Sequence, residues 1–322
     1  MSFATELREG SQPWTLYEVI PPDRSAPRET IADQAAYIAN LLVDHGIDAI
    51  NIPEIRNEER NGDRVAGFME KYDPRNFGMT IQDVFDGDID LVVNHAVVYD
   101  EADAQREWFR ATYEKFGIDS VVIVGGESSD VDYPGPSVPA AAQLAREVGQ
   151  DVGLDPCLGA ITIPTRRRED LDEPERMLAK IDDGAEFFTS QVIYEADSTR
   201  QLLVDYDRAC REHGVDPAPV FLSFAPITGR KDARFLEWLG VRIPDEVKNW
   251  VFQARANPLD RSVRVAEHLL REILTFTDRR DLDVPIGINV EHIMRYNFDA
   301  SEVLLDRLDS LLDWHELENQ RT

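Results

Sequence analysis

The sequence predicts an α/β protein, a single-domain (β/α)8 TIM barrel. Eight short apolar runs alternate with segments of helical periodicity along the 322 residues. The connections are mostly short, and no linker rich in Pro, Ser or Gly divides the chain. Polar side chains also follow several of the apolar runs, which is typical of barrels that present ligand-binding groups at one mouth. A doubly wound open sheet is the alternative architecture.

The expected elements follow one another in a regular order. Strands are predicted at residues 14–20, 48–52, 89–98, 119–124, 158–163, 185–190, 219–225 and 284–290. Helices are predicted at residues 28–44, 65–72, 101–116, 138–150, 173–183, 197–213, 231–239, 244–255, 262–276 and 301–317. Ser137 and Asp197 are expected to cap the helices that follow them. Residues 73–89 are expected to be irregular, with a short strand near residues 79–81.

This pattern divides the chain into three parts. Residues 1–13 form a ragged lead-in, residues 14–300 form the barrel as the catalytic domain, and residues 301–322 form a C-terminal helix that packs on the barrel.

The chain is strongly acidic. Its 62 Asp and Glu residues against 34 Lys and Arg give a net charge of −28, and only five of the basic residues are Lys. The acids are spread over the expected helix faces, which argues against binding to nucleic acid or anionic membranes. A solvated acidic shell is typical of a protein from a high-salt cytoplasm, where salt screens the repulsion. An ordinary acidic enzyme is the alternative.

Nothing in the sequence points to export or to a bilayer. Cys157 and Cys210 form neither a CxxC pair nor a metal-ligand spacing, so we expect buried thiols and no metal site. No basic segment followed by an apolar stretch opens the chain. No run approaches the roughly 18 apolar residues of a membrane-spanning helix. We therefore expect a cytoplasmic protein with no membrane partner.

Glu18 interrupts the first apolar run, which extends from Trp14 to Ile20. A carboxylate inside a buried strand is unfavourable unless it is paired or protonated. Apolar neighbours raise the pKa of a carboxyl group toward the range of a general acid. We therefore interpret Glu18 as a catalytic acid, with an outward-facing or ion-paired glutamate as the alternative.

Other polar groups stand at expected strand ends, and each has a structural alternative. His95 is either a ligand contact or a core residue, and Glu54 is either a site acid or a solvated loop residue. The glycines of Gly125-Gly126-Glu127 would let backbone amides approach a ligand, or they form a tight turn. The arginines at residues 166–168 would bind an anionic group, or they pair with the acidic shell.

Four segments resemble motifs of the methylenetetrahydrofolate reductase family. They are similar to the E-[FV]-[FI]-P-P opening, the K-x-D-A-G-A…[TS]-Q segment, the MP[IV] turn and the VRIP element of that family. In this chain they read Tyr17-Glu18-Val19-Ile20-Pro21-Pro22, Lys180-Ile181-Asp182-Asp183-Gly184-Ala185 with Ser190-Gln191, Ala225-Pro226-Ile227-Thr228, and Val241-Arg242-Ile243-Pro244. Their order and spacing agree over roughly residues 14–300.

The resemblance implies an oxidoreductase that reduces 5,10-methylenetetrahydrofolate to 5-methyltetrahydrofolate with NAD(P)H, usually through FAD. Glu18 matches the general acid of the family, and Gln191 matches the amide that reads the pterin ring. Glu127 and Ser190 are expected to help bind the folate. The residues expected to bind the cofactor are His95, Gly125, Gly126, Tyr133, Arg167 and Lys180. Barrels of this family often self-associate, so a homo-oligomer is also considered.

Several groups that hold FAD in the family are changed in this chain. Members that bind FAD carry Arg-Gly-Asp where this chain has Gly125-Gly126-Glu127, and Pro-Glu-x-His where it has Pro164-Thr165-Arg166-Arg167. Ala179 stands where a second basic residue is expected. Hydride transfer through FAD and direct transfer from NAD(P)H therefore both stay open.

Two other classes of protein also stay open. One is a different pterin-dependent one-carbon enzyme, either a methyltransferase or another reductase. The other is a non-catalytic barrel that binds a pterin or a flavin. The presence of both Glu18 and Gln191 favours an enzyme, because a bare scaffold needs neither.

Overall fold

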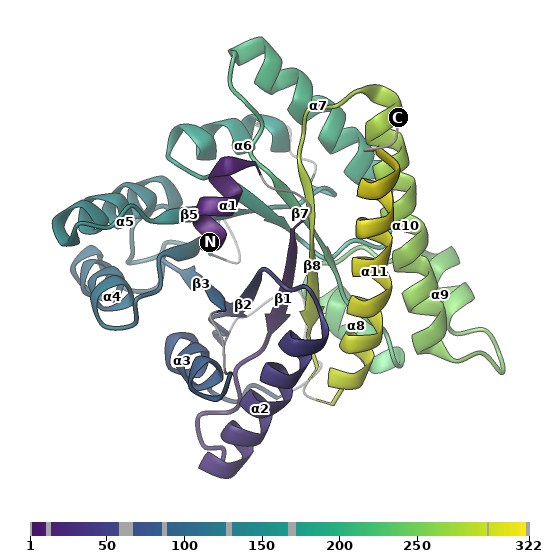
Figure 1. Ribbon diagram of the computed structural model, residues 1–322, viewed down its shortest axis with the longest axis horizontal. Coiled ribbons are helices and arrows are strands. Elements are labelled where there is room, and N and C mark those ends of the chain that lie inside the picture. The colour runs from purple at the N-terminus through teal and green to yellow at the C-terminus, as the bar shows by residue number, and fades with distance from the viewer. Residues whose placement is uncertain are drawn as a thin grey trace.

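Eight parallel strands close into a barrel in the order of the chain, with β8 paired to β1 (Figure 1). The computed structural model describes residues 2–10, 14–57, 67–85, 89–126, 131–166, 172–294 and 296–319. Within these ranges the strands are β1 (Thr15–Val19), β2 (Ala49–Pro53), β3 (Asp90–Ala96), β4 (Ser120–Val124), β5 (Cys157–Thr162), β6 (Phe187–Ser190), β7 (Val220–Phe224) and β8 (Ile286–His292). The expected (β/α)8 barrel is confirmed, and the closing pair excludes an open sheet.

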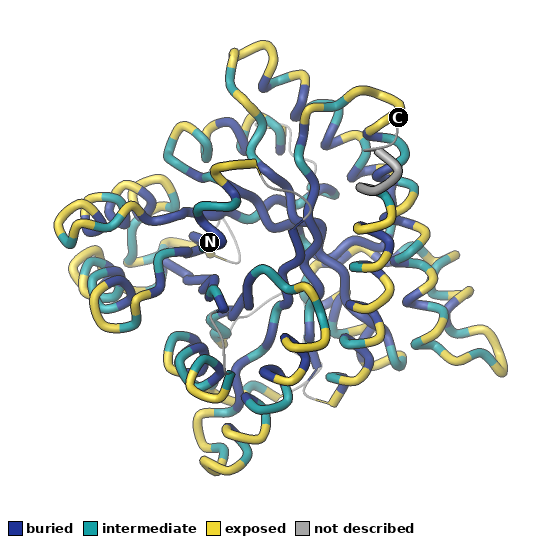
Figure 2. The backbone as a smooth tube through the Cα atoms, viewed as in Figure 1, coloured by how far each residue is buried: buried dark blue, intermediate teal, exposed yellow. Residues whose placement is uncertain are grey.

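Helices surround the strands. They are α2 (Arg28–Asp44), α3 (Pro74–Val84), α4 (Ala102–Glu114), α5 (Val138–Val152), α6 (Glu173–Asp182), α7 (Asp197–His213), α8 (Arg230–Trp238), α9 (Asp245–Val251), α10 (Pro258–Arg280) and α11 (Phe298–Asn319). Figure 2 shows the strands buried at the centre, with exposed residues on the outer faces of the helices. Among the described residues, no helix is both long enough and apolar enough to cross a membrane.

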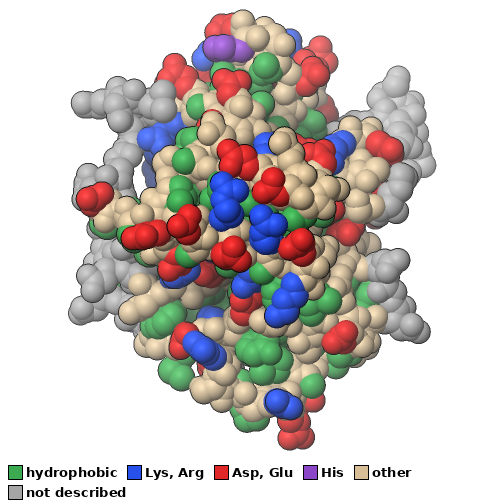
Figure 3. Space-filling view, turned by 90° about the vertical axis from the view of Figure 1, so that its left-hand side faces the viewer, with side chains coloured by type: hydrophobic (Ala, Val, Ile, Leu, Met, Phe, Trp, Pro, Cys, Tyr) green, Lys and Arg blue, Asp and Glu red, His purple; other side chains and the backbone are tan. Residues whose placement is uncertain are grey.

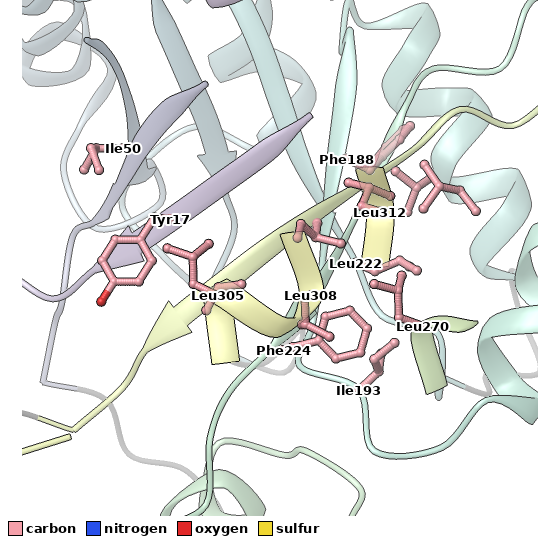
Figure 4. Packing of buried hydrophobic residues seen from close by; sticks show 14 of the residues in the cluster. Tyr17, Ile50, Phe188, Ile193, Leu222, Phe224, Leu270, Leu305, Leu308 and Leu312 are labelled. Carbon is pink, nitrogen blue, oxygen red and sulfur yellow. The ribbon is translucent and has the colours of Figure 1, made fainter. Parts of the chain in front are cut away.

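The main core lies between the outer wall of the barrel and the helices. Leu222 and Phe224 of β7 pack toward Leu270 of α10 and Leu308 of α11 (Figure 4). These four side chains are almost fully buried. Because successive strand residues face opposite sides of a sheet, the alternate positions of the same strands point into the barrel.

The lead-in contains a helix that the sequence analysis does not predict. α1 (Phe3–Glu9) begins at Ser2, whose hydroxyl accepts the backbone N–H of Thr5. The ring of Phe3 lies 5.6 Å from that of Phe187 and 5.9 Å from that of Phe221. Both partners point into the barrel near the amino ends of their strands, so α1 closes that end.

The prediction for the segment before β3 is wrong in two ways. Residues 67–72 are not helical, and residues 74–84 form α3 instead of an irregular segment with a strand. Asp73 caps α3 by accepting the backbone N–H of Arg75, and Pro74 occupies the first turn. Helical geometry is unfavourable for the residue before a proline, whereas proline itself suits the first turn of a helix, so α3 begins at Pro74.

Other boundaries differ by a few residues. Asp197 is the first residue of α7 and does not cap it, because the preceding Ala196 holds the cap position. α9 ends at Val251, four residues before the expected end, and α10 begins four residues earlier than expected. The difference that matters for the site is in β8, which continues to His292 and therefore includes Glu291.

Candidate active site

A layer of polar side chains crosses the interior of the barrel near the carboxyl ends of its strands. The layer below it is apolar and includes Leu16, Ala49, Val92, Phe187 and Phe221. Two residues further along each of these strands stands a polar side chain. It also faces the barrel interior, because alternate residues of a strand face the same side. With the two from β8, this polar layer consists of Glu18, Asn51, Asn94, Thr189, Ser223, Asn289 and Glu291.

Glu18 lies at the centre of a hydrogen-bond network in the polar layer. Its Oε2 accepts hydrogen bonds from Nδ2 of Asn51 at 2.8 Å and from Nδ2 of Asn289 at 3.2 Å. The same Asn289 nitrogen lies 3.0 Å from Oγ of Ser223 and 3.4 Å from Oε1 of Glu291. Glu18 is thus held by neutral amides rather than by a cation.

Burial raises the pKa of Glu18 to about 7, against the opposing effect of hydrogen bonds from Asn289 and Asn94. Both the protonated and the ionised form are therefore populated near neutral pH. A carboxyl group with such a pKa can donate a proton at neutral pH and leave a carboxylate behind. The interpretation of Glu18 as a general acid rests on this property.

The polar layer also contains hydrogen-bond acceptors that lack donors. The amide oxygens of Asn51, Asn94 and Asn289 are buried, and no hydrogen bond from the described part of the chain reaches them. The hydroxyl of Thr189 is in the same condition. Buried acceptors normally have partners, so such a group is complementary to a ligand or water with N–H or O–H donors, or to a cationic ligand.

Ser190 is the last residue of β6, and Gln191 follows it directly. Nε2 of Gln191 donates to the backbone oxygen of Leu239 at 3.2 Å, and the side chain is half-buried beyond the end of β6. The hydroxyl of Ser190 donates to the backbone oxygen of Gln191 and accepts the N–H of Ser223, which holds β6 against β7. Substrate binding by Gln191 and by Ser190 both stay predictions.

His95 points out of the barrel toward α4. Its Nδ1 lies 2.7 Å from Oε2 of Glu54 and its Nε2 lies 2.6 Å from Oε1 of Gln105. Its ring stacks on Trp108 with the two centroids 3.6 Å apart. Both ring nitrogens are engaged, so contact with a cofactor would require one of these bonds to be exchanged.

Glu54 is held as an anion beside His95. Burial raises its pKa, but hydrogen bonding and the charges of His95 and Arg56 outweigh this and leave the pKa below its usual value. Oε1 of Glu54 forms an ion pair with Arg56 at 2.8 Å. Glu54 is therefore a poor proton donor, in contrast to Glu18.

Several groups predicted to hold a cofactor after β4 and β5 contact other parts of the chain instead. A Cβ atom at Gly126 would lie 2.3 Å from the ring of Tyr133, and one at Gly125 would lie 3.2 Å from Val138. Nζ of Lys180 donates to the backbone oxygen of Ile161 at 2.6 Å, and burial lowers its pKa to about 8.

Arg166, the neighbour of these groups, forms an ion pair with Glu173 at 3.0 Å. Glu127 and Arg167 lie outside the described residues. Over the part of the chain that is described, no group of three His, Cys, Asp or Glu side chains is arranged to hold a metal ion.

Six members of the polar layer are not predicted as site residues from the sequence. They are Asn51, Asn94, Thr189, Ser223, Asn289 and Glu291. The available signal is a polar residue two positions after an apolar one in each strand, as in Ala49–Asn51 and Phe221–Ser223. This signal becomes specific only when the strands are known to face one interior.

Fold and site together define a (β/α)8 barrel with a titratable acid in a polar layer at the carboxyl ends of its strands. The sequence profile described as methylenetetrahydrofolate reductase matches residues 104–280, more than half of the 322 residues. The chain belongs to the methylenetetrahydrofolate reductase family. The matched region begins in α4, so Glu18 lies outside it.

Solved structures share the fold of this chain, whereas no curated protein sequence matches it. An uncharacterized protein from Clostridium thermocellum, which binds two copies of 5-methyl-5,6,7,8-tetrahydrofolic acid, is similar with a TM-score of 0.76 and 21% identity. The similarity covers 95% of this chain and 99% of that chain. EDTA monooxygenase from Chelativorans sp. BNC1 is similar with a TM-score of 0.52 and 10% identity, over 94% of each chain. At these identities the likeness establishes the fold alone.

Proposed function

We propose that this protein reduces 5,10-methylenetetrahydrofolate to 5-methyltetrahydrofolate, with Glu18 as the general acid. The observation that carries the proposal is the environment of Glu18. It is an acid with a pKa of about 7, inside a layer of neutral amides at the carboxyl ends of the barrel strands. Membership of the methylenetetrahydrofolate reductase family supports the choice of substrate.

The chemistry needs a proton before it needs a hydride. Glu18 gives its proton to the bridging nitrogen of the folate, the bond from this nitrogen to the methylene carbon breaks, and the other nitrogen forms an iminium with that carbon. The carboxylate left on Glu18 and the unpartnered amide oxygens of Asn51 and Asn289 stabilise the cation. Hydride then adds to the methylene carbon. Gln191 supplies both a donor and an acceptor for the edge of the pterin ring.

The described residues after β4 and β5 do not fit the diphosphate of FAD, which the family generally binds. The Tyr133 ring covers Gly126, Arg166 is paired with Glu173, and Lys180 is bonded to the backbone of β5. Each of these groups is thus engaged within the chain, and none is arranged as the set of several converging donors that a diphosphate needs. We therefore propose that NAD(P)H gives its hydride directly to the folate.

One observation favours a second candidate, a barrel that binds folate without reducing it or that uses it in another one-carbon reaction. The similar Clostridium thermocellum protein binds 5-methyltetrahydrofolate, which is both the product of the reductase and a methyl donor. An enzyme and a pure binder differ in the response to Glu18→Gln. The substitution leaves binding nearly intact in both, but only an enzyme loses turnover.

The test is an absorption spectrum of the purified protein in high salt, before and after incubation with FAD, followed by an assay of NADH and NADPH oxidation. The expected result is no bound flavin band and oxidation that depends on methylenetetrahydrofolate. A flavin band that NAD(P)H bleaches and methylenetetrahydrofolate restores would replace direct transfer by transfer through FAD. Binding of folate without any oxidation of NADH or NADPH would overturn the reductase.

A further inference from the structure

Glu291 stands directly opposite Glu18. The strands β1 and β8 are paired so that the Cα atoms of these two residues are partners in the register. Adjacent strands lie about 5 Å apart, so two carboxyl groups enter the polar layer side by side. Nδ2 of Asn289 is within hydrogen-bond distance of both, at 3.2 Å from Glu18 and 3.4 Å from Glu291.

Among the described residues, the neighbours of the two carboxyl groups do not neutralise two negative charges. The neighbours from β2, β3, β6 and β7 in the polar layer are Asn51, Asn94, Thr189 and Ser223, all uncharged. No hydrogen bond or ion pair to Lys, Arg or His is recorded for either carboxyl group within the described ranges. The phenol of Tyr194 also interacts with Glu291, and burial and the acids Asp232 and Glu291 raise the pKa of this phenol, so it stays protonated.

Asn289 responds to the charge of both acids. Its Nδ2 carries two hydrogens and faces three acceptors, on Glu18, Ser223 and Glu291. The carboxyl group that is ionised accepts the stronger bond, because hydrogen bonds to a charged acceptor are shorter and stronger. The amide therefore supports either position of a single negative charge.

We propose that Glu291 shares a proton with Glu18, so that the pair holds at least one proton through the neutral range and returns one to Glu18 after it has protonated the folate. This inference rests on the proposed function of Glu18. Glu291 acts through Glu18 and not on the substrate, so it is a positioning residue. Burial and the charge of Glu18 both raise the pKa of Glu291 well above its usual value, which agrees with this role.

Only protons move in the added step. The O–H bond of Glu18 breaks as an N–H bond forms on the folate, which leaves one carboxylate beside the cation. The proton of Glu291 then passes to Glu18, and solvent protonates Glu291. One proton is taken up per folate reduced, which matches the proton that the reduction consumes.

The kinetic test compares the pH dependence of kcat/KM for the wild type and Glu291→Gln. Glutamine keeps the shape and removes the second proton. Near about pH 6 the rates should agree within a few fold, and near about pH 9 the variant should fall at least about tenfold further behind, because Glu18 then titrates alone. Glu291→Asp restores a second acid and should recover part of the activity at high pH.

Asp48→Asn is the matched control. Asp48 is a carboxyl group whose pKa burial raises to about 6, but it bonds to the N–H of Thr15 at the opposite end of β1. Its replacement should leave the high-pH limb in place. Proton sharing would be overturned if Glu291→Gln left kcat/KM unchanged at every pH, or lowered it by the same factor at every pH.

An infrared titration tests the pair without any turnover. The protonated-carboxyl band of Glu291 is identified by its absence from Glu291→Gln. In Glu18→Gln this band should disappear at a pH roughly one unit or more lower than in the wild type, because the charge of Glu18 is gone. An unchanged midpoint would overturn the pairing. If the midpoint shifts but the reductase assay fails, the shared proton stands. The proposed reaction, and with it the return of a proton to Glu18 during turnover, would then be overturned.

Discussion

At the scale of the residue, the burial that raises the pKa of Glu18 also destabilises the fold when Glu18 is ionised. Its folded pKa of about 7 exceeds its usual 4.5, so the folded state holds a proton that the unfolded chain releases between these values. The contribution of Glu18 to stability is therefore greatest below about pH 4.5 and is lost as the pH rises through about 7.

Glu18→Gln should accordingly make the protein more stable at high pH. We expect a gain on the order of 1–3 kcal/mol in the free energy of unfolding near about pH 8 and little change near about pH 4.5. Urea denaturation of both proteins at the two pH values, at one salt concentration, measures this difference. A gain of the same size at both pH values would show that ionisation of Glu18 is not its cause.

The site could be predicted from the sequence only in part, and the reason is visible in its residues. Glu18 is detectable because a carboxylate among Tyr17, Val19 and Ile20 breaks a local rule. Its partner Asn289 is 271 positions away, and nothing local marks an asparagine in β8 as different from a surface residue. Closure of the barrel brings the two together, and closure is a property of all eight strands.

At the scale of the element, most strands and helices follow from periodicity, and the misses have local causes. α3 escapes because its short amphipathic pattern, with Phe77 and Ile81 on the buried face, lies in a segment that reads as irregular. The signal that identifies it is Asp73-Pro74, a capping residue followed by a proline suited to the first turn. α1 is not predicted because its apolar residues pack against side chains inside the barrel and not against a neighbouring helix.

The closure of the barrel's amino-terminal end by α1 can be tested at Phe3. Phe3→Ala removes a fully buried ring that contacts Phe187 and Phe221, and it should lower the free energy of unfolding by about 3–5 kcal/mol. Glu9→Ala, at an exposed position of the same helix, is the control and should change little. Thermal or urea denaturation checks the pair. A loss below about 1 kcal/mol for Phe3→Ala would mean that α1 does not close the barrel.

At the scale of the whole molecule, charge is the dominant surface property. Figure 3 shows acidic side chains spread over one face with basic side chains between them, rather than gathered in one patch. On α4 and α5, Arg106 pairs with Glu147 at 2.9 Å and Arg110 with Asp151 at 3.4 Å. Such exposed pairs contribute little each to stability. They do not change the net charge of −28, which is the excess of acids over all basic residues.

The stability of the protein should therefore increase with salt. Raising KCl from about 0.1 M to about 2 M screens the repulsion among the acids, and the melting temperature should rise by several degrees or more. Differential scanning calorimetry across this range measures the effect. Because the repulsion is nonspecific, NaCl should act similarly, and a melting temperature that stays flat or falls would contradict an unbalanced acidic shell.

The central claim, that Glu18 is the general acid of a folate reductase, is tested most directly by turnover of the wild type and Glu18→Gln side by side. Calorimetric titration with 5-methyltetrahydrofolate, run in parallel, measures folate binding by both. We expect NAD(P)H oxidation with methylenetetrahydrofolate by the wild type, a rate lower by a factor of about 10²–10⁴ in the variant, and similar folate affinity in both. Equal turnover by the two proteins, at equal folate affinity, would contradict the account.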